Sequence, residues 1–291
     1  MDRFKDIQFE RFWQRSTGYL IMFVITLLMA VPVAWMLTTA LRPEGTVRQY
    51  PVNWIPPDIT LKNFQLVMEK VPALGRWFFN SAFIALATTF FSLLIDSLAA
   101  YALARMEFFG KQIVFLGILA TMLIPVEATM VPLYLGLANL KILTTDFGTY
   151  MSLIFPVVAN AFGLYLLTQF FQGIPKDLED SARIDGCTEL GIWWRIILPL
   201  SGPALTATAI FTFMASWNNF VWPFIVTSSD TTRTLPAGLA MVFGGITGSP
   251  SSVQYGMVMA GAVLATLPPL IIFVVLQRYF VQGISLTGIK G

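Results

Sequence analysis

Residues 177–186, DLEDSARIDG, gather carboxylates, an arginine and small side chains in a chain that is 56% hydrophobic and only 12% charged. Ser181 and Ala182 add little bulk, so the groove of another protein could close tightly over them. The chain has no histidine and one cysteine, Cys187, so it lacks the commonest zinc ligand and cannot form an internal disulfide. The chemistry expected of this segment is recognition, with no metal site.

The segment 173–186, GIPKDLEDSARIDG, is predicted to be a helix. Pro175 suits the first turn, and the acidic residues that follow it favour the positive N-terminal end of the helix. Glu179 and Arg183 stand four residues apart and can pair. Gly186 is expected to stop the helix.

A second short helix, TELGIWWRIIL, is predicted to follow, with Thr188 as its cap and Pro199 as its end. On physical grounds alone, the polar segment is explained slightly better as a solvated connector of two short helices than as a docking surface. Both interpretations stay open at this point.

Long apolar runs surround this polar stretch and recur along the chain. Each is about 20 residues long, which is the length that a helix needs to cross a bilayer core of roughly 30 Å. The sequence therefore predicts an all-α polytopic membrane protein. Its six expected transmembrane helices are Tyr19–Leu41, Trp77–Ala104, Gln112–Leu137, Thr149–Phe171, Ala204–Val226 and Gly256–Phe280.

The distribution of lysine and arginine gives the orientation of these spans. Placing both termini in the cytoplasm puts most of the basic residues there, and among the short loops only Lys141 and Arg233 then face outward. The net charge is only +2 and no basic block occurs, so nucleic acid is not an expected partner. The predicted parts are a cytoplasmic N-terminal segment (1–18), a first span (19–41), an external loop (42–75), a membrane core (76–280) with a cytoplasmic loop at 172–199, and a cytoplasmic tail (281–291).

The external loop contains LKNFQLVMEKV, which has apolar residues at helical spacing. It predicts a short amphipathic helix at the outer surface, and a brace for the first span is favoured over a partner-binding role. The apolar positions are Leu61, Phe64, Val67, Met68 and Val71.

The polar loop resembles a known signature. Permease subunits of binding-protein-dependent ABC importers carry E-A-A, three residues, Gly, nine residues and then I-x-L-P in a cytoplasmic loop. Here DSA at 180–182, Gly186 and the IILP that ends at Pro199 match every gap, although Asp180 replaces Glu and Ser181 replaces Ala. The resemblance implies that this loop seats in a cleft of an ATP-hydrolysing subunit. The implied coupling residues are Glu179, Asp180, Ser181, Ala182, Asp185 and Gly186.

The segments SLAAYALARMEFFGK, SWNNFVWPF and QRYFVQGISLTGIKG look like the maltose-type carbohydrate-uptake subfamily. That resemblance implies the type I ABC importer permease fold in a bacterial or archaeal cytoplasmic (inner) membrane, surrounded by lipid. It implies as partners a homologous second permease subunit, two copies of an ABC ATPase subunit and an external solute-binding protein. The tail from Gly283 to Gly291 would reach between the ATPase subunits.

The chain has no phosphate-binding loop of the type G-x-x-x-x-G-K-[ST], since Gly110-Lys111 is followed by Gln112. We therefore expect that it is not an enzyme and binds no cofactor itself. ATP and Mg would be used by the partner ATPase subunits.

Two acids lie inside predicted spans, where an ionisable group costs at least about 2.5–3.5 kcal/mol and needs a partner or water. Asp96 is most simply a residue buried against a neighbouring helix. Glu127 follows Pro125, which breaks the helix, and counting from Gln112 places it in the outer half of the third span. It is a candidate for the translocation path.

The fifth span supplies further path candidates, because amides and aromatic rings suit the hydroxyls and flat C–H faces of sugars. The alternative is that the amides join helices and the indoles lie at the outer interface, an interpretation favoured for Trp222. The candidates are Trp217, Asn218 and Asn219, with Asn160 in the fourth span as a weaker one.

The leading hypothesis is an ATP-driven importer subunit for a sugar (a mono- or oligosaccharide or a polyol). Glycerol 3-phosphate is an alternative substrate, disfavoured because spans three to six carry no lysine or arginine except Arg278, near the cytoplasmic end of the sixth span. From a different class, a stand-alone secondary transporter would use Asp96 and Glu127 as proton or ion sites.

Overall fold

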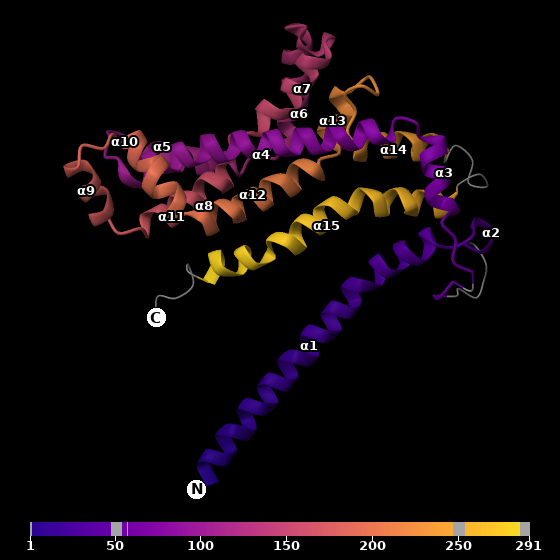
Figure 1. Cartoon of the computed structure of the whole chain (residues 1–291), viewed down its shortest axis with the longest axis horizontal. Helices are drawn as coiled ribbons and strands as arrows, with labels where there is room; N and C mark the ends of the chain where they lie inside the picture. Colours follow the sequence, from indigo (N-terminus) through magenta and orange to yellow (C-terminus); the bar gives the residue numbers. More distant parts are fainter. Residues whose placement is uncertain (1, 48–53, 57, 247–253, 286–291) are drawn as a thin grey trace. The chain divides into compact units, whose positions relative to one another are not determined.

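The computed structural model describes residues 2–47, 54–56, 58–246 and 254–285, and every regular element in these ranges is a helix (Figure 1). The predicted all-α class is confirmed. The chain divides into two compact units, Met1–Pro72 with Phe243–Thr266 and Ala73–Val242 with Leu267–Gly291. Each unit is described by itself.

The first unit contains α1 (Asp2–Ala40), α2 (Glu44–Val47), α3 (Lys62–Lys70) and the start of α15 (Tyr255–Ser285). Asn63 Nδ2 donates hydrogen bonds to the carbonyl oxygens of Ala40 and Arg42, at 2.8 and 2.7 Å. The Glu44 carboxylate accepts from the first backbone amides of α15, at Tyr255 and Gly256, each at 2.8 Å. This carboxylate satisfies amides that have no partner within the helix.

The short helix predicted in the loop 42–75 is present as α3, but its buried face differs from the predicted one. Val67 and Val71 are buried as expected, whereas Leu61 and Met68 are more than half exposed. Asn63 shares the buried side with Val67, and its amide bonds to the end of α1. Much of the proline-rich stretch before α3 lies outside the described residues.

The second unit is built on α4 (Leu74–Arg105), which packs against α8 (Ala161–Gln172) and α12 (Gly202–Trp217). The backbones approach closely because the contact positions carry small side chains, as is typical of helices packed in a membrane. At Gly163, an added Cβ would lie 2.7 Å from Asp96 Oδ2 and 3.0 Å from Thr208 Cγ2. The three helices therefore meet at this glycine.

The helices long and apolar enough to cross a membrane are Ser16–Ala40, Leu74–Arg105 and Tyr255–Gln277. They correspond to the first, second and sixth predicted spans. The described residues reach six spans only if three bent helix pairs each count as one. α1 also runs through the predicted boundary at residue 18, and α15 continues to Ser285, beyond the predicted start of the tail; the rest of the tail lies outside the described residues.

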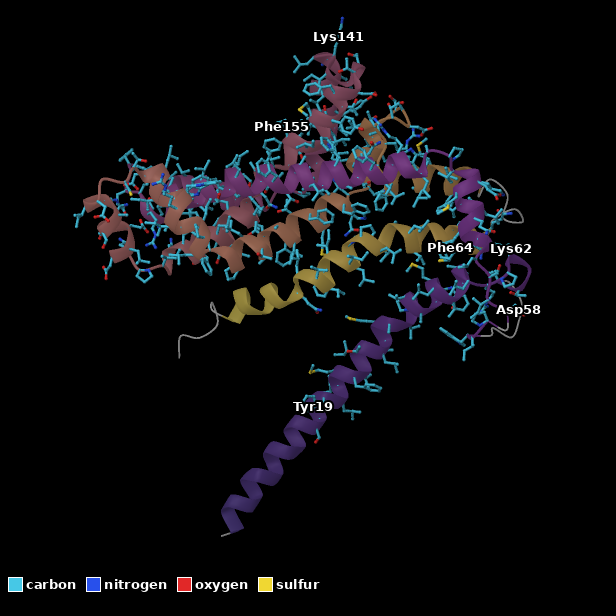
Figure 2. The ribbon with its side chains drawn as sticks, in the orientation of Figure 1. Tyr19, Asp58, Lys62, Phe64, Lys141 and Phe155 are labelled. Carbon is cyan, nitrogen blue, oxygen red and sulfur yellow. The ribbon has the colours of Figure 1, made fainter. Side chains whose placement is uncertain are left out.

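The third span is broken, as Pro125 predicted. α5 (Lys111–Thr121) and α6 (Val126–Asn139) meet at 93°. After the turn η1 (Ile142–Thr144), the chain returns through α7 (Asp146–Ile154). Lys141 lies at the tip of this pair, whereas Phe155 lies beside α4, its ring centroid 5.6 Å from that of Phe91 (Figure 2).

The fourth and fifth spans are also interrupted. Pro156 lies in a single turn, η2 (Phe155–Val157), and α7 with η2 makes an angle of 47° with α8. The predicted span Ala204–Val226 is not continuous, because α12 ends at Trp217 and α13 covers only Val221–Val226. Pro223 has no N–H to bond to the carbonyl of Asn219, four residues earlier. α14 (Leu235–Ile246) follows.

Candidate functional site

The predicted recognition helix is α9, Asp177–Ile184, and its C-terminus has the geometry that Gly186 predicts. Gly186 has a φ of 81°, in the left-handed region. Its N–H donates to the carbonyl of Arg183 at 3.1 Å, and the N–H of Cys187 donates to that of Ala182 at 2.9 Å. These two bonds form a Schellman motif, which fixes where the helix stops and how the chain leaves it.

Glu179 faces the interior of the protein. Its Oε1 lies 2.8 Å from Nε of Arg105, the last residue of α4, and both side chains are only 2% exposed. The atoms face each other as an ion pair without the alignment of a hydrogen bond. Arg105 also donates to the carbonyl of Ile174, just before α9. α9 is thus attached to the end of α4 through buried charges.

Ala182 also faces inward, which corrects the interpretation of Ser181 and Ala182 as one exposed, low-bulk surface. Ala182 is 7% exposed and belongs to a core cluster with Tyr101, Phe171 and Ile192. Its small size is needed for this internal packing. The remaining predicted coupling residues, Asp180, Ser181, Asp185 and Gly186, are exposed.

Arg183 joins α9 to α10 (Glu189–Ile192). Its Nε and Nη2 lie 2.8 and 3.2 Å from the two carboxylate oxygens of Glu189, and its Nη1 lies 2.8 Å from Asp180 Oδ1. The hydrogen bonds from Arg183 hold the pKa of Glu189 below its usual value. The same bonds to Glu189 are the main cause that raises the pKa of Arg183. The Tyr101 hydroxyl of α4 donates to Glu189 Oε2 at 2.5 Å.

The second predicted helix of the loop begins where expected, because the Thr188 hydroxyl accepts from the N–H of Gly191 at 3.2 Å. Its end is different. A π-helical stretch, η3 (Trp193–Ile197), leads into α11 (Leu198–Leu200), which contains Pro199, and the chain turns by 83° into α12. The apolar side chains of Ile184, Leu190 and Trp194 are 87%, 67% and 63% exposed. The loop therefore presents a mixed apolar and acidic surface.

Asp96 occupies a different place, in the last third of α4. It is 1% exposed, its Oδ2 accepts from the Ser92 hydroxyl at 2.8 Å, and its Oδ1 accepts from the backbone N–H of Asn160 at 3.1 Å. Asn160 stands at the break before α8. The carboxylate therefore supplies a partner for a backbone amide that the break leaves without one, as the prediction of a residue buried against a neighbouring helix implied.

The path candidates lie on three different elements. Glu127 is exposed in the first turn of α6, and the 93° bend removes the straight span from which its depth was predicted. Asn160 caps α8, since its Oδ1 accepts from the N–H of Phe162 at 3.0 Å. Asn218 and Asn219 lie in the break between α12 and α13, where Asn218 is exposed.

Trp217 is 2% exposed and its ring centroid lies 5.5 Å from that of Phe78 and 5.9 Å from that of Phe213. In this conformation its ring is covered by the protein, which corrects the expectation of a path-lining side chain. Trp222 is also buried, with its indole N–H donating to the carbonyl of Ser152 at 3.0 Å, so it does not lie at an interface with lipid.

The family of binding-protein-dependent transport system inner membrane components matches residues 96–286, a range that includes α9, α10 and the breaks before α8 and after α12. The chain belongs to this family. It is a multi-pass membrane protein and the permease component of a binding-protein-dependent importer, as the resemblance of the polar loop implied.

Relatives of this permease cover nearly its whole length. It is 35% identical to the arabinooligosaccharides transport system permease protein AraQ of Halalkalibacterium halodurans, over 96% of each chain. It is 30% identical to the sn-glycerol-3-phosphate transport system permease protein UgpE of Yersinia enterocolitica, over 91% of this chain and 94% of that one. A chain of a bacterial ABC transporter involved in alginate import has the same fold, with a TM-score of 0.77, 23% identity, and coverage of 91% of this chain and 95% of that chain.

Sequence reasoning missed the residues that hold the loop in place. Arg105, Tyr101 and Glu189 were not among the candidates. Arg105 is the last residue of a long apolar helix, α4, and Glu189 follows the cap residue of α10. A basic residue at the end of a transmembrane helix is usually interpreted as a sign of how the protein is oriented in the membrane. Only the fold shows that its charge is turned inward toward Glu179.

Proposed function

We propose that this permease forms, with a homologous second permease, the translocation path for a sugar delivered by an external binding protein across a bacterial or archaeal cytoplasmic membrane. α9 docks on one of two ATPase subunits, which bind ATP and Mg and hydrolyse the ATP. The termini face the cytoplasm, in accordance with the distribution of lysine and arginine.

The observation that carries this proposal is the construction of the loop. The buried side of α9 is fixed by Glu179 and Ala182, and its stop is fixed by Gly186. This leaves a rigid exposed face with Asp180, whose side chain is 63% exposed, and Ile184, which is 87% exposed. A preordered surface with an apolar residue beside a charge suits docking, because little conformational entropy is lost on binding.

A sugar is favoured as the substrate by the names of relatives such as the arabinooligosaccharide permease. The amides of Asn218, which is exposed, and Asn219, which is partly buried, lie at the break and are chemically suited to hydroxyl groups. Glycerol 3-phosphate is the second candidate, favoured by the resemblance to UgpE. Against it, spans three to five carry no lysine or arginine that would offset the phosphate charge, and Arg278 of the sixth span lies near the end of that span, so the second permease would have to supply the charge.

The test is to purify the permease with its neighbours and to reconstitute the complex in lipid. We expect an ATPase subunit to co-purify, and ATP hydrolysis to rise with sugar-loaded binding protein more than with binding protein loaded with glycerol 3-phosphate. The isolated permease should neither bind nor hydrolyse ATP. Solute transport by the permease alone, with no ATPase attached, would instead support the stand-alone transporter.

A further inference from the structure

α4 has polar attachments at three places along its length, and all of them lie in one compact unit of the structure. Its cytoplasmic end is joined to the coupling loop, Asp96 in its last third is joined to the break before α8, and its outer end is joined to the loop 228–235. Figure 1 shows α9 and α10 at one end of this helix. The three attachments together suggest what α4 does.

The cytoplasmic attachment consists of the buried pair Arg105–Glu179 and the hydrogen bond from Tyr101 to Glu189. One reaches α9 and the other reaches α10, so both helices of the loop are joined to the last turns of α4. A buried ion pair has a defined geometry and loses much more when one partner is removed than an exposed pair does. This joint cannot shift freely.

The outer attachment is formed by side chains of α4 that bond to backbone groups. Asn80 Nδ2 donates to the carbonyl oxygens of Thr231 and Arg233 at 3.0 and 2.8 Å, and its Oδ1 accepts from the Tyr150 hydroxyl at 2.7 Å. The Ser81 hydroxyl accepts from the N–H of Leu235 at 2.8 Å. Asn80 and Ser81 are buried, so these bonds are shielded from water.

α4 is also the continuous element between these attachments. It has 32 residues, contains no proline and spans about 48 Å at about 1.5 Å per residue. The two helices that enter and leave the coupling loop along the chain are interrupted: α8 begins at a 47° bend, and α12 follows an 83° bend at its start. A displacement of the coupling loop could be transmitted along α4 without crossing a bend. Along the chain itself, the same displacement would cross the bend before α8 on one side of the loop and the bend before α12 on the other.

We propose that α4 is the rigid element that carries movement of the coupling loop to the outer loop 228–235, and that Arg105 is the positioning residue at the joint. This inference rests on the proposed docking of α9 to an ATPase subunit. It separates two neighbouring acids: Glu179 is an internal anchor, while Asp180 is left for the partner. Asp96 keeps the break before α8 in register with the same helix.

The experiment uses the whole complex in lipid nanodiscs and a thiol probe on the outer loop. Cys187 is the only cysteine of this chain, so Cys187→Ser with Ser228→Cys gives the permease a single, exposed thiol, and labelling is read on the permease after it is separated from its partner subunits. Its labelling rate with a membrane-impermeant maleimide is measured without nucleotide and after trapping with ATP and vanadate. We expect the rate to change on trapping when Arg105 and Glu179 are intact.

Arg105→Met with Glu179→Met removes both charges and so leaves no unpaired buried charge. In this double variant we expect the ATPase subunit still to co-purify, and the nucleotide-dependent change in labelling to be lost. Glu107→Gln is the matched control, because it removes an exposed pair with Lys111 near the same end of α4 and should leave the response intact.

A full labelling response in the assembled double variant overturns the inference. If that variant does not assemble, Tyr101→Phe decides, because it removes only the hydrogen bond to Glu189; a reduced response supports the joint and an unchanged response counts against it. Failure of the proposed function looks different, since no ATPase subunit would then co-purify with the permease in which Arg105 and Glu179 are intact.

Discussion

Arg105 and Glu179 lie in different helices, yet their side chains meet at 2.8 Å and each is 2% exposed. The pair joins the end of the longest span of the second unit to the helix that carries the family signature. An acid in the signature region would ordinarily be assigned to the partner ATPase. Here the fold turns it inward and leaves Asp180 outside.

Removing one member of this pair should destabilise the permease. Glu179→Ala leaves the buried charge of Arg105 without its partner, which costs on the order of 3–5 kcal/mol, and Arg105→Ala should cost less because Arg183 Nη2 stays 3.4 Å from Glu179 Oε2. We expect a lower unfolding temperature for the purified complex and a reduced yield, with Arg105→Met plus Glu179→Met recovering most of both. A single alanine variant as stable as the exposed-pair control Glu107→Gln would contradict a buried ion pair at this position.

Gly186 should be the most restrictive position of the coupling loop. No atom lies within 4 Å of an added Cβ, so a substitution is strained only by the φ of 81°, which costs an L-residue roughly 1–2 kcal/mol. Asparagine tolerates this conformation better, whereas a β-branched residue tolerates it worst. Gly186→Asn should keep most transport, and Gly186→Val should uncouple transport while membrane insertion stays intact. Normal sugar uptake by Gly186→Val would show that this stop is not needed for coupling.

Asp96 should act through hydrogen bonding and not through a proton cycle. Asp96→Asn keeps an oxygen that can accept from the N–H of Asn160. Asp96→Ala removes the hydrogen bonds, and a hydrogen bond to a charged acceptor contributes about 1.5–3 kcal/mol to stability. We expect the asparagine variant to transport nearly normally and the alanine variant to unfold at lower temperature. Both are checked by thermal unfolding and by uptake in the same membranes. Lost uptake in a fully stable Asp96→Asn variant would instead favour an ion site.

Asn218 and Asn219 are path candidates at a break in the fifth span, where Asn218 is exposed and Asn219 is partly buried. An amide–hydroxyl hydrogen bond contributes about 0.5–1.5 kcal/mol, so each alanine substitution should weaken uptake by roughly 2- to 12-fold. The measurement compares sugar-stimulated ATPase activity with the amount of ATPase subunit co-purified. Reduced assembly with normal activity per complex would mean that these amides only join helices.

The sequence determined the features that depend on neighbours a few residues away. The stop at Gly186 and the cap at Thr188 were predictable because each is a bond between groups within one helical turn. The break at Pro125 followed from the missing N–H of proline. Hydrophobic length identified the continuous spans, and the fixed gaps of the polar loop identified the family.

The tertiary structure decided which side of each element faces the protein. Glu179 and Asp180 are consecutive on α9, so the helix turns them to different sides. Only the position of Arg105 at the end of α4 shows that Glu179 is the anchor and that Asp180 is exposed. The sequence likewise gives no sign that Asp96 meets the backbone of Asn160. These contacts join residues far apart along the chain, and their energy depends on burial that exists only once the helices have packed.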